Sequence, residues 1–437
     1  MKIKLISHAS VIFTTEDCRI WTDPWLFGKA FNDSWSLDPP PAWDPSWLND
    51  ITLLWISHEH PDHFHIPTLK SLPAEFKGRV KLLYQQNNSD KMWEAFRRFG
   101  FQNFQSLPHR KLSQVTKQTE VYCHQIGNMD SMLAVRDGSL TVLNVNDCEI
   151  NTSDCRRVIH DLHRVDVVLN QFSLAGSTGS PDHVHVLKRV ADNILKIMIE
   201  NHKDLGAKVT IPIASFMYFS CTDNRHINDS ANRISDVYRH FNENGLETAI
   251  LYPGDQYIGG EPWNSQAALE HFEKDSKQEE QRQYSEPVIV RLEEIASALK
   301  KTSERLHDRY TALVVRRLKP VMAFLPDLNK TIRFSVANGK LEEVASGTEA
   351  DITVNSQPLL FAFSSSFGIQ TLGVSGRYFI HRNHTNWRRH RILFAMDNAE
   401  IFLRPKYLFS RKNIRFLIER FPGAWNQMRY KLARMGI

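Results

Sequence analysis

The chain has 437 residues, more than one hydrophobic core usually organises, so we expect a catalytic domain and a second, smaller domain. Hydrophobic residues make up 42% and charged residues 24% of the chain, which excludes an extensively disordered protein. The formal net charge of +5 is small for this length and argues against a general nucleic-acid binder.

The 5 cysteines are scattered singly along the chain, without a CxxC pair. This pattern indicates neither a disulfide framework nor a structural zinc ribbon. The first residues lack the cleavage site of a secretory signal, and no apolar run approaches the roughly 18 residues that a membrane-spanning helix needs. We therefore expect a cytoplasmic protein.

The chain begins with three strand patterns, at residues 2–6, 10–14 and 19–22, which predict a β-meander. A continuous apolar run at residues 51–56 then leads directly into the sequence SHEHPDHFH. Further strands are expected at residues 80–84, 132–135, 140–145, 165–169, 208–213 and 247–252, and helices at 90–99 and 185–202. Strands that alternate with helices after a strand-rich beginning predict an α/β fold with a β-sandwich between helices.

The composition becomes polar and highly charged at residues 264–287, which we interpret as a linker. It separates a catalytic domain at residues 1–263 from an α+β domain at 288–403. In the second domain we expect a helix at residues 288–299 and strands at 331–336, 350–354 and 400–403.

The segment 404–437 is rich in basic and aromatic residues and almost free of acids. We expect a helical tail. Such a tail either packs on the domain with its basic face in solvent, or lies on an anionic membrane surface or an acidic partner.

The most specific signal is the run HEHPDH, which places His58, His60, Asp62 and His63 at the end of an apolar strand. Polar groups beside a core must find partners, and a metal ion satisfies several of them at once. Neutral imidazoles with a carboxylate suit zinc, and they also suit iron(II) or manganese. The sequence therefore predicts a metal centre, with the nearby His65 outside the ligand set.

This run, with DPWL upstream and NVNDC downstream, resembles the metallo-β-lactamase superfamily. Within that superfamily the chain resembles the CMP-N-acetylneuraminate hydroxylase family over roughly its first 260 residues. The matching stretches are ISHAS, TDPWLFGKAF, WISHEHPDHFHIPTL, IGNMDSMLAV, LNVNDC, FSLAGSTG and IPIASFMYF. The resemblance implies an αββα sandwich.

The resemblance also implies two divalent metal ions. His58 and His60 would hold one ion together with a third histidine. Asp62 and His63 would hold the other with a further histidine, and Asp147 would bridge the two ions. The alternative for Asp147 is an ordinary turn aspartate.

Two ligand positions stay open. His124 is the candidate third histidine, and Asp130 is its rival, because the related hydroxylases carry an acidic residue there; a carboxylate would shift the ligand set toward iron. His226 is the candidate for the last ligand. Asp23 either orients a ligating imidazole through its other ring nitrogen or serves only to form a turn.

The segment FSLAGSTG is rich in small residues, so its backbone N–H groups would be able to approach an anionic substrate such as a phosphate. Ser177, Thr178 and Arg225 are the candidate substrate contacts. The alternative is a plain loop.

Hydrolysis of an anionic substrate is the favoured function, with Asp62 accepting a proton from metal-activated water. The substrate would be phosphate-like, nucleotide-sugar-like or lipid-linked. Residues 331–379 resemble a sterol-carrier-protein domain, which suggests the lipid-linked substrate; otherwise this region is a packing domain.

The first alternative is a non-heme iron oxygenase related to the hydroxylases. The animal-type hydroxylases carry a Rieske cluster, which needs paired Cys and His motifs that this sequence lacks. Such an oxygenase would need a separate electron-transfer protein. The second alternative is an inert metal-binding protein.

Overall fold

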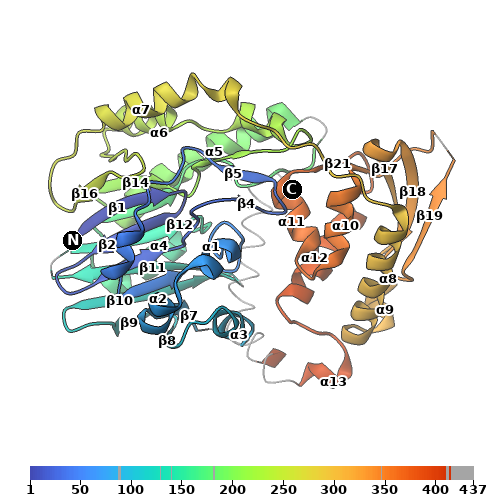
Figure 1. Cartoon of the computed structure of the whole chain (residues 1–437), viewed down its shortest axis with the longest axis horizontal. Coiled ribbons are helices and arrows are strands. Elements are labelled where there is room, and N and C mark those ends of the chain that lie inside the picture. Colours follow the sequence, from blue (N-terminus) through green and yellow to red (C-terminus); the bar gives the residue numbers. More distant parts are fainter. Residues whose placement is uncertain are drawn as a thin grey trace.

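The computed structural model describes residues 1–86, 90–127, 129–138, 140–180, 183–345, 347–409 and 413–414. Figure 1 shows two units side by side: a large sandwich of sheets and helices, drawn in blue, green and yellow, and a smaller unit in orange and red. We call the smaller one the C-terminal unit and define it as the described residues from 288 to 409.

A seven-stranded sheet forms one half of the sandwich, in the order β16-β1-β2-β3-β6-β7-β8. The first four strands pair antiparallel, and β3, β6, β7 and β8 pair parallel. The strands are β1 (Lys2–Ser7), β2 (Ser10–Thr14), β3 (Arg19–Thr22), β6 (Leu53–Ile56), β7 (Lys81–Gln85), β8 (Asn103–Leu107) and β16 (Gln256–Ile258).

A five-stranded sheet, in the order β10-β11-β12-β13-β14, forms the other half. Its strands are β10 (Thr119–Ile126), β11 (Asp130–Asp137), β12 (Leu140–Asn146), β13 (Val167–Gln171) and β14 (Val209–Ile213). A small third sheet joins β15 (Met217–Phe219), β5 (Trp35–Leu37) and β4 (Lys29–Ala30). The short strand β9 (Lys111–Gln114) lies next to β10.

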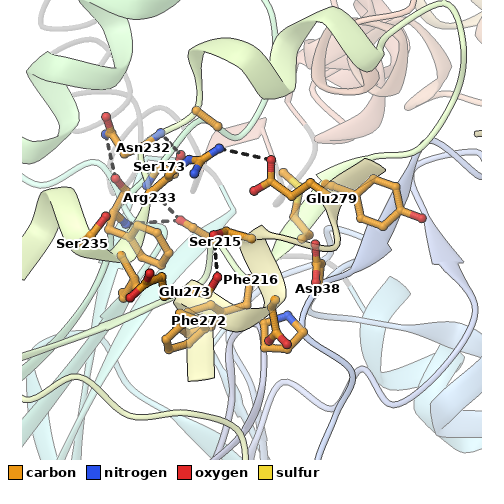
Figure 2. A pocket seen from close by; sticks show the side chains of 18 of the residues that line it. Asp38, Ser173, Ser215, Phe216, Asn232, Arg233, Ser235, Phe272, Glu273 and Glu279 are labelled. Carbon is orange, nitrogen blue, oxygen red and sulfur yellow. Dashed lines mark hydrogen bonds and ion pairs between the residues drawn. The ribbon is translucent and has the colours of Figure 1, made fainter. Parts of the chain in front are cut away.

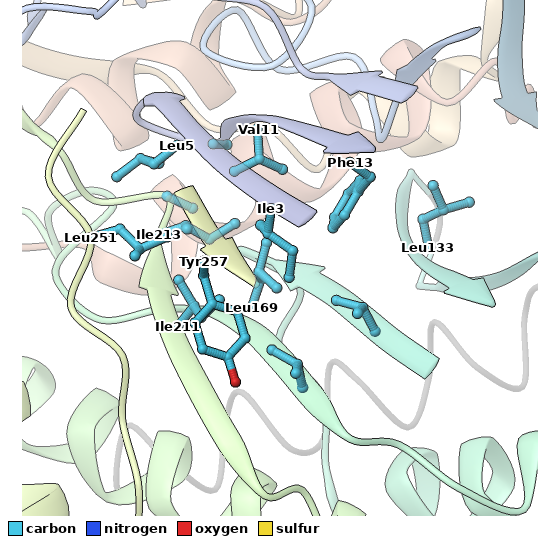
Figure 3. Close-up of a cluster of buried hydrophobic side chains, with 14 of the residues drawn as sticks. Ile3, Leu5, Val11, Phe13, Leu133, Leu169, Ile211, Ile213, Leu251 and Tyr257 are labelled. Atoms are coloured by element: carbon cyan, nitrogen blue, oxygen red, sulfur yellow. The ribbon is translucent and has the colours of Figure 1, made fainter. Parts of the chain in front are cut away.

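Successive side chains of a strand point to opposite faces of the sheet, so each sheet packs on both of its faces. On β11, Leu133 and Val135 point into the core between the sheets, and Met132 and Ala134 point to the outer face. Figure 3 shows the inner core, where Ile3, Leu5 and Phe13 of one sheet lie near Leu133, Leu169 and Ile211 of the other.

Helices cover both outer faces of the sandwich. Apolar side chains of α1 (Ile66–Ser71), α2 (Ala74–Arg79) and α3 (Lys91–Arg98) pack on the seven-stranded sheet. On the other side α4 (Thr152–Leu162) packs on the five-stranded sheet, and α5 (His183–Leu205) contacts α4 and β13. The layers are αββα, which confirms the predicted fold class.

The C-terminal unit has a sheet and a core of its own. Its sheet has the order β19-β18-β17-β20-β21, with buried apolar residues shared between sheet and helices. The strands are β17 (Val321–Leu325), β18 (Lys330–Ser335), β19 (Lys340–Val344), β20 (Ile352–Val354) and β21 (Tyr378–Ile380), and the helices are α8 (Leu292–Arg309), α9 (Ala312–Val315), α10 (Ser356–Ser364), α11 (Gly368–Ser375), α12 (His384–Asn398) and α13 (Pro405–Leu408).

The region expected to be a linker contains a helix. Helix α6 (Ile234–Glu243) precedes it, and α7 (Gln266–Ser276) lies inside it. Ala268, Leu269 and Phe272 of α7 pack against the inner core. These three residues share one helical face, and that spacing explains why a polar segment still folds onto the sandwich.

Two expected strands do not form. Of residues 247–252, Ala249, Ile250 and Leu251 are buried, but the segment makes only one isolated bridge, between Thr248 and Thr210. Residues 400–403 do not form a strand, although Ile401 is buried. An apolar run predicts that its residues are buried, but buried residues need not form a strand.

Most of the expected helical tail at residues 404–437 lies outside the described residues. Its described part contains α13, where Lys406 pairs with Asp308 of α8 at 2.7 Å. Among the described residues, we find no helix with both the length and the apolar character needed to cross a bilayer.

One buried histidine makes the C-terminal unit sensitive to acid. His390 of α12 is completely buried, and its Nδ1 donates to the carbonyl oxygen of Asn386 at 2.9 Å. Burial lowers the pKa of His390 to about 4. The imidazole is therefore neutral in the folded protein.

We expect the free energy of unfolding to fall as the pH drops from about 7.5 to about 5. Over this range His390 becomes protonated in the unfolded chain but stays neutral in the folded protein. The loss through this residue is about 2 kcal/mol at about pH 5. The variant His390→Phe removes the titrating group, so urea denaturation should show an acid loss smaller by that amount. Exposed His384→Phe is the control. An acid loss in His390→Phe equal to that of the unmodified chain would contradict the assignment.

Candidate metal centre

The centre is built where several strands end. Strand β6 ends at Ile56, and the turn that follows carries His58, His60, Asp62 and His63. Backbone N–H groups of His63 and Phe64 donate to the carbonyl oxygen of His60, at 3.0 and 2.7 Å, and hold the turn closed. His58 and His63 are completely buried and Asp62 is 3% exposed.

A first group of possible ligands consists of His58, His60 and Asp130, whose ligand atoms lie within 4.8 Å of one another. Nε2 of His58 and Nδ1 of His60 are 2.7 Å apart. Asp130 begins β11 and pairs with Ile126 across the β10–β11 hairpin, so the turn of that hairpin brings its carboxylate to the β6 end.

A second group consists of His8, Asp62 and His63. Oδ2 of Asp62 lies 3.1 Å from Nε2 of His8 and 3.3 Å from Nε2 of His63. His8 occupies the turn between β1 and β2, at the same edge of the sandwich.

Asp147 lies between the two groups, just after β12. Its Oδ2 is 3.6 Å from Nε2 of His58 and 3.5 Å from Nε2 of His63. His58, His63 and Asp147 thus also form a group within ligand distance.

Hydrogen bonds to Asp23 and Ser57 orient the imidazole rings of His58 and His63. Oδ2 of Asp23 accepts from Nδ1 of His63 at 2.8 Å, and the Ser57 hydroxyl, which lies 2.9 Å from Nδ1 of His58, donates to the same carboxylate at 2.7 Å. The backbone N–H of Ser57 also donates to Asp23, at 2.8 Å. With Nδ1 engaged in both rings, the inward Nε2 atoms keep the direction that a metal ligand needs.

Three buried atoms here make no hydrogen bond to any described residue: Nδ1 of His8, Oδ1 of Asp62 and Oδ1 of Asp147. Unpaired polar atoms in a core are costly. Imidazole nitrogens and carboxylate oxygens are also the donors that divalent metal ions take, so the residues fit such an ion.

The charges of the cluster depend on one another. Burial acts to lower the pKa of His63, but Asp147, Asp62 and Asp23 outweigh it and raise that pKa well above its usual range. Burial acts to raise the pKa of Asp62, but His63 and His8 hold it well below its usual range. Burial and the neighbouring His58 lower the pKa of His60. Positive charge is therefore favoured between these carboxylates, as a cation would supply it.

His124 is not brought to the centre. Its Nδ1 lies 3.2 Å from the Tyr122 hydroxyl, and its Nε2 lies 3.9 Å from Asp154 of α4. Burial lowers its pKa to about 3. Alternation along β10 explains the placement: Cys123 points into the inner core, so Tyr122 and His124 point to the opposite face.

The other candidate residues also lie away from the ligand groups. The ring of His226 contacts Phe379 of the C-terminal unit, with centroids 5.2 Å apart, and exposed Arg225 lies over the Tyr284 ring. The hydroxyls of Ser177 and Thr178 accept backbone N–H groups of their own loop. The Ser177 N–H donates to Gly373 of α11, so this loop packs against the C-terminal unit.

His8 is the residue that sequence reasoning missed as a ligand. A single histidine in a two-residue turn has no motif of its own. The available signal was its position at the end of a strand, which it shares with Asp23, His58 and Asp147.

A separate cavity of about 470 Å³ lies at the end of the sandwich near α6 and α7 (Figure 2). Its lining includes Ser215, Phe216 and Phe272 but none of the residues of the metal groups. Two ion pairs lie in its lining: Arg282 with Asp38, and Arg233 with Glu279 at 3.2 Å.

Residues 2–197 match the family model of the beta-lactamase superfamily domain. Cytidine monophosphate-N-acetylneuraminic acid hydroxylase from Danio rerio is 26% identical over 242 residues, which cover 52% of this chain and 40% of the relative. The Mus musculus hydroxylase is 24% identical over 247 residues, covering 53% and 41%. The match therefore spans about two fifths of the length of these relatives.

Among solved structures, an isothiocyanate hydrolase from Delia radicum gut bacteria is similar, with a TM-score of 0.44 and 13% identity. The similarity covers 59% of this chain and 99% of the hydrolase. The family match and the hydroxylase relatives confirm the resemblance that the sequence motifs predicted.

The geometry predicts which histidines matter for metal binding. We expect His8→Ala to weaken metal binding about tenfold or more, because it removes a member of the second group. His226→Ala and His124→Ala should leave the affinity within about twofold of the unmodified protein. Competition with a chromophoric chelator measures all three. Equal losses in His8→Ala and His226→Ala would show that the placement of these residues is wrong.

Proposed function

From the beta-lactamase superfamily domain at residues 2–197, we propose that this chain is a metal-dependent enzyme that hydrolyses an anionic substrate. One observation carries the proposal: four histidines and three aspartates from four separate segments converge at one edge of the sandwich, with buried atoms left unpaired among them. A purely structural cluster would pair these atoms with one another.

The residues would hold two ions. His58, His60 and Asp130 would bind one, His8, Asp62 and His63 the other, and Asp147 would contact both. Bound divalent ions would make a water molecule acidic enough to act as a nucleophile and would polarise the bond to be cleaved.

The chain's own groups have separate tasks in this proposal. Asp23 and Ser57 fix the rings of His58 and His63. Asp62 has one oxygen engaged by His8 and His63, and its other oxygen, Oδ1, is the one able to accept a proton. Hydrolysis needs water alone as the second reactant.

The substrate class is proposed from the relatives. Their name gives a nucleotide-activated acidic sugar as their substrate, and an anion of that kind suits a centre that binds cations. A lipid-linked anion remains the alternative, suggested by the resemblance of residues 331–379 to a sterol-carrier-protein domain.

A second candidate function is oxidation by an iron centre with dioxygen. Asp130, rather than His124, joins His58 and His60, and a third carboxylate makes the ligand set more favourable for iron than a histidine would. The hydroxylase relatives support the same reaction. This enzyme would need electrons from a separate protein.

Metal analysis followed by two assays separates the candidates. Protein purified without added metal should contain about two ions per chain. Zinc together with cleavage of phosphodiester, lactone or amide substrates supports hydrolysis; iron together with substrate-dependent dioxygen uptake supports oxidation and rejects hydrolysis.

The same assays need a ligand variant and a control. His58→Ala should lose at least ~100-fold in activity, because it removes a ligand that faces both the first group and Asp147. The exposed His185→Ala should keep full activity. If the purified protein neither contains nor takes up a divalent metal, the proposed metal-dependent function is wrong.

A further inference from the structure

The C-terminal unit reaches the metal centre through the last residue of α12. Nζ of Lys91 lies 3.1 Å from Oδ1 of Asn398 and 2.6 Å from Oε2 of Glu59. Nδ2 of Asn398 donates to Sδ of Met129 at 3.6 Å. One amide thus makes contacts in two directions.

Both contacts end beside candidate ligands. Glu59 lies in the chain between His58 and His60, and Met129 directly precedes Asp130. The first ligand group is therefore divided between two loops that no strand pairing joins directly. Asn398, with Lys91, links these two loops.

The exposed fractions of Asn398, Glu59 and Lys91 indicate how firmly these side chains are held. Asn398 is 7% exposed. The side chain of Glu59 is 15% exposed and that of Lys91 36%. An ion pair of an exposed lysine restrains it only weakly, and the hydrogen bond with a buried amide at a helix end adds a second restraint on its position.

The C-terminal unit is held in place by other contacts. Arg377 is 4% exposed and donates to both carboxylate oxygens of Asp223, at 2.9 and 3.0 Å. Gln357 and Asn32 exchange two hydrogen bonds, at 2.8 and 3.1 Å. Because this contact region does not include Asn398, removing the Asn398 amide should leave the two units docked.

We propose that Asn398 is a positioning residue of the metal centre, which fixes the His58–His60 loop against Asp130 from the C-terminal unit. The inference rests on the proposed function, because it needs the metal that the function requires. It adds a contact from the C-terminal unit to those that the sandwich itself provides, where Ser131 donates to the carbonyl oxygen of Ser57 at 2.6 Å and Gln85 donates to the carbonyl oxygens of Ser57 and Met129.

The test measures metal binding and its spectrum rather than turnover. Cobalt(II) is titrated into metal-free full-length protein, with the affinity obtained by chelator competition and the ligand geometry by visible absorption. We expect Asn398→Ala to weaken binding of one of the two ions about tenfold and to change its absorption bands, with the other ion within about twofold. Asn398→Asp keeps an acceptor for Lys91 and should retain more of the affinity than Asn398→Ala.

Matched variants separate positioning from general damage. Asn338→Ala removes the same side chain from an exposed turn of the same unit and should change nothing. Lys91→Ala should reproduce the loss of Asn398→Ala, and the double variant should lose little more, because both act through one contact.

The outcomes are distinct. Unchanged affinity and spectrum in both Asn398→Ala and Lys91→Ala would overturn the inference, as would an equal weakening of both ions with a lower melting temperature of the metal-free protein. Absence of cobalt binding in the unmodified protein would instead remove the proposed function, and the inference with it.

Discussion

The structure depends on a constraint at one edge of the sandwich: buried carboxylates and imidazoles must be compensated there. Strand ends and hairpin turns deliver them from both sheets, so the αββα layers fix their spacing. The site even uses backbone conformations that L side chains disfavour, since Asp23, Asn146 and Ala214 all have positive φ and flank it. Such conformations persist where surrounding contacts hold them, as the hydrogen bonds of Asp23 to Ser57 do.

The sandwich and the C-terminal unit make different contributions to the candidate metal centre. The sandwich supplies all the residues of the candidate ligand groups, and the C-terminal unit packs on the loops around them. The FSLAGSTG segment, expected to contact an anion, instead forms part of this packing, with Ser177 bonded to Gly373 and Gly179 accepting from Ile380. Its glycines permit this close packing: a Cβ on Gly176 would lie 3.3 Å from the backbone Cα of Val374, and one on Gly179 would lie 2.9 Å from the Tyr378 ring.

The sequence predicted those parts whose signal is local. The strands β2 and β3 lie at the expected residues, and the HEHPDH run follows a buried strand as its pattern indicated. His124 and His226 were chosen by their order along the chain, which does not tell the face of a strand or the packing of a turn. His8 carried no local pattern. Contacts between distant segments decided all three, as they did for Ala249, Ile250 and Leu251, which are buried without forming a strand.

The most direct test of the account is a crystal structure of purified protein with anomalous data collected at the zinc, iron and manganese edges. The account predicts an anomalous peak about 2.0–2.2 Å from the imidazole nitrogens of His58 and His60 and from a carboxylate oxygen of Asp130, and a second peak by His8, Asp62 and His63. Density with these side chains turned apart, and no anomalous scatterer among them in protein soaked with each metal, would contradict it.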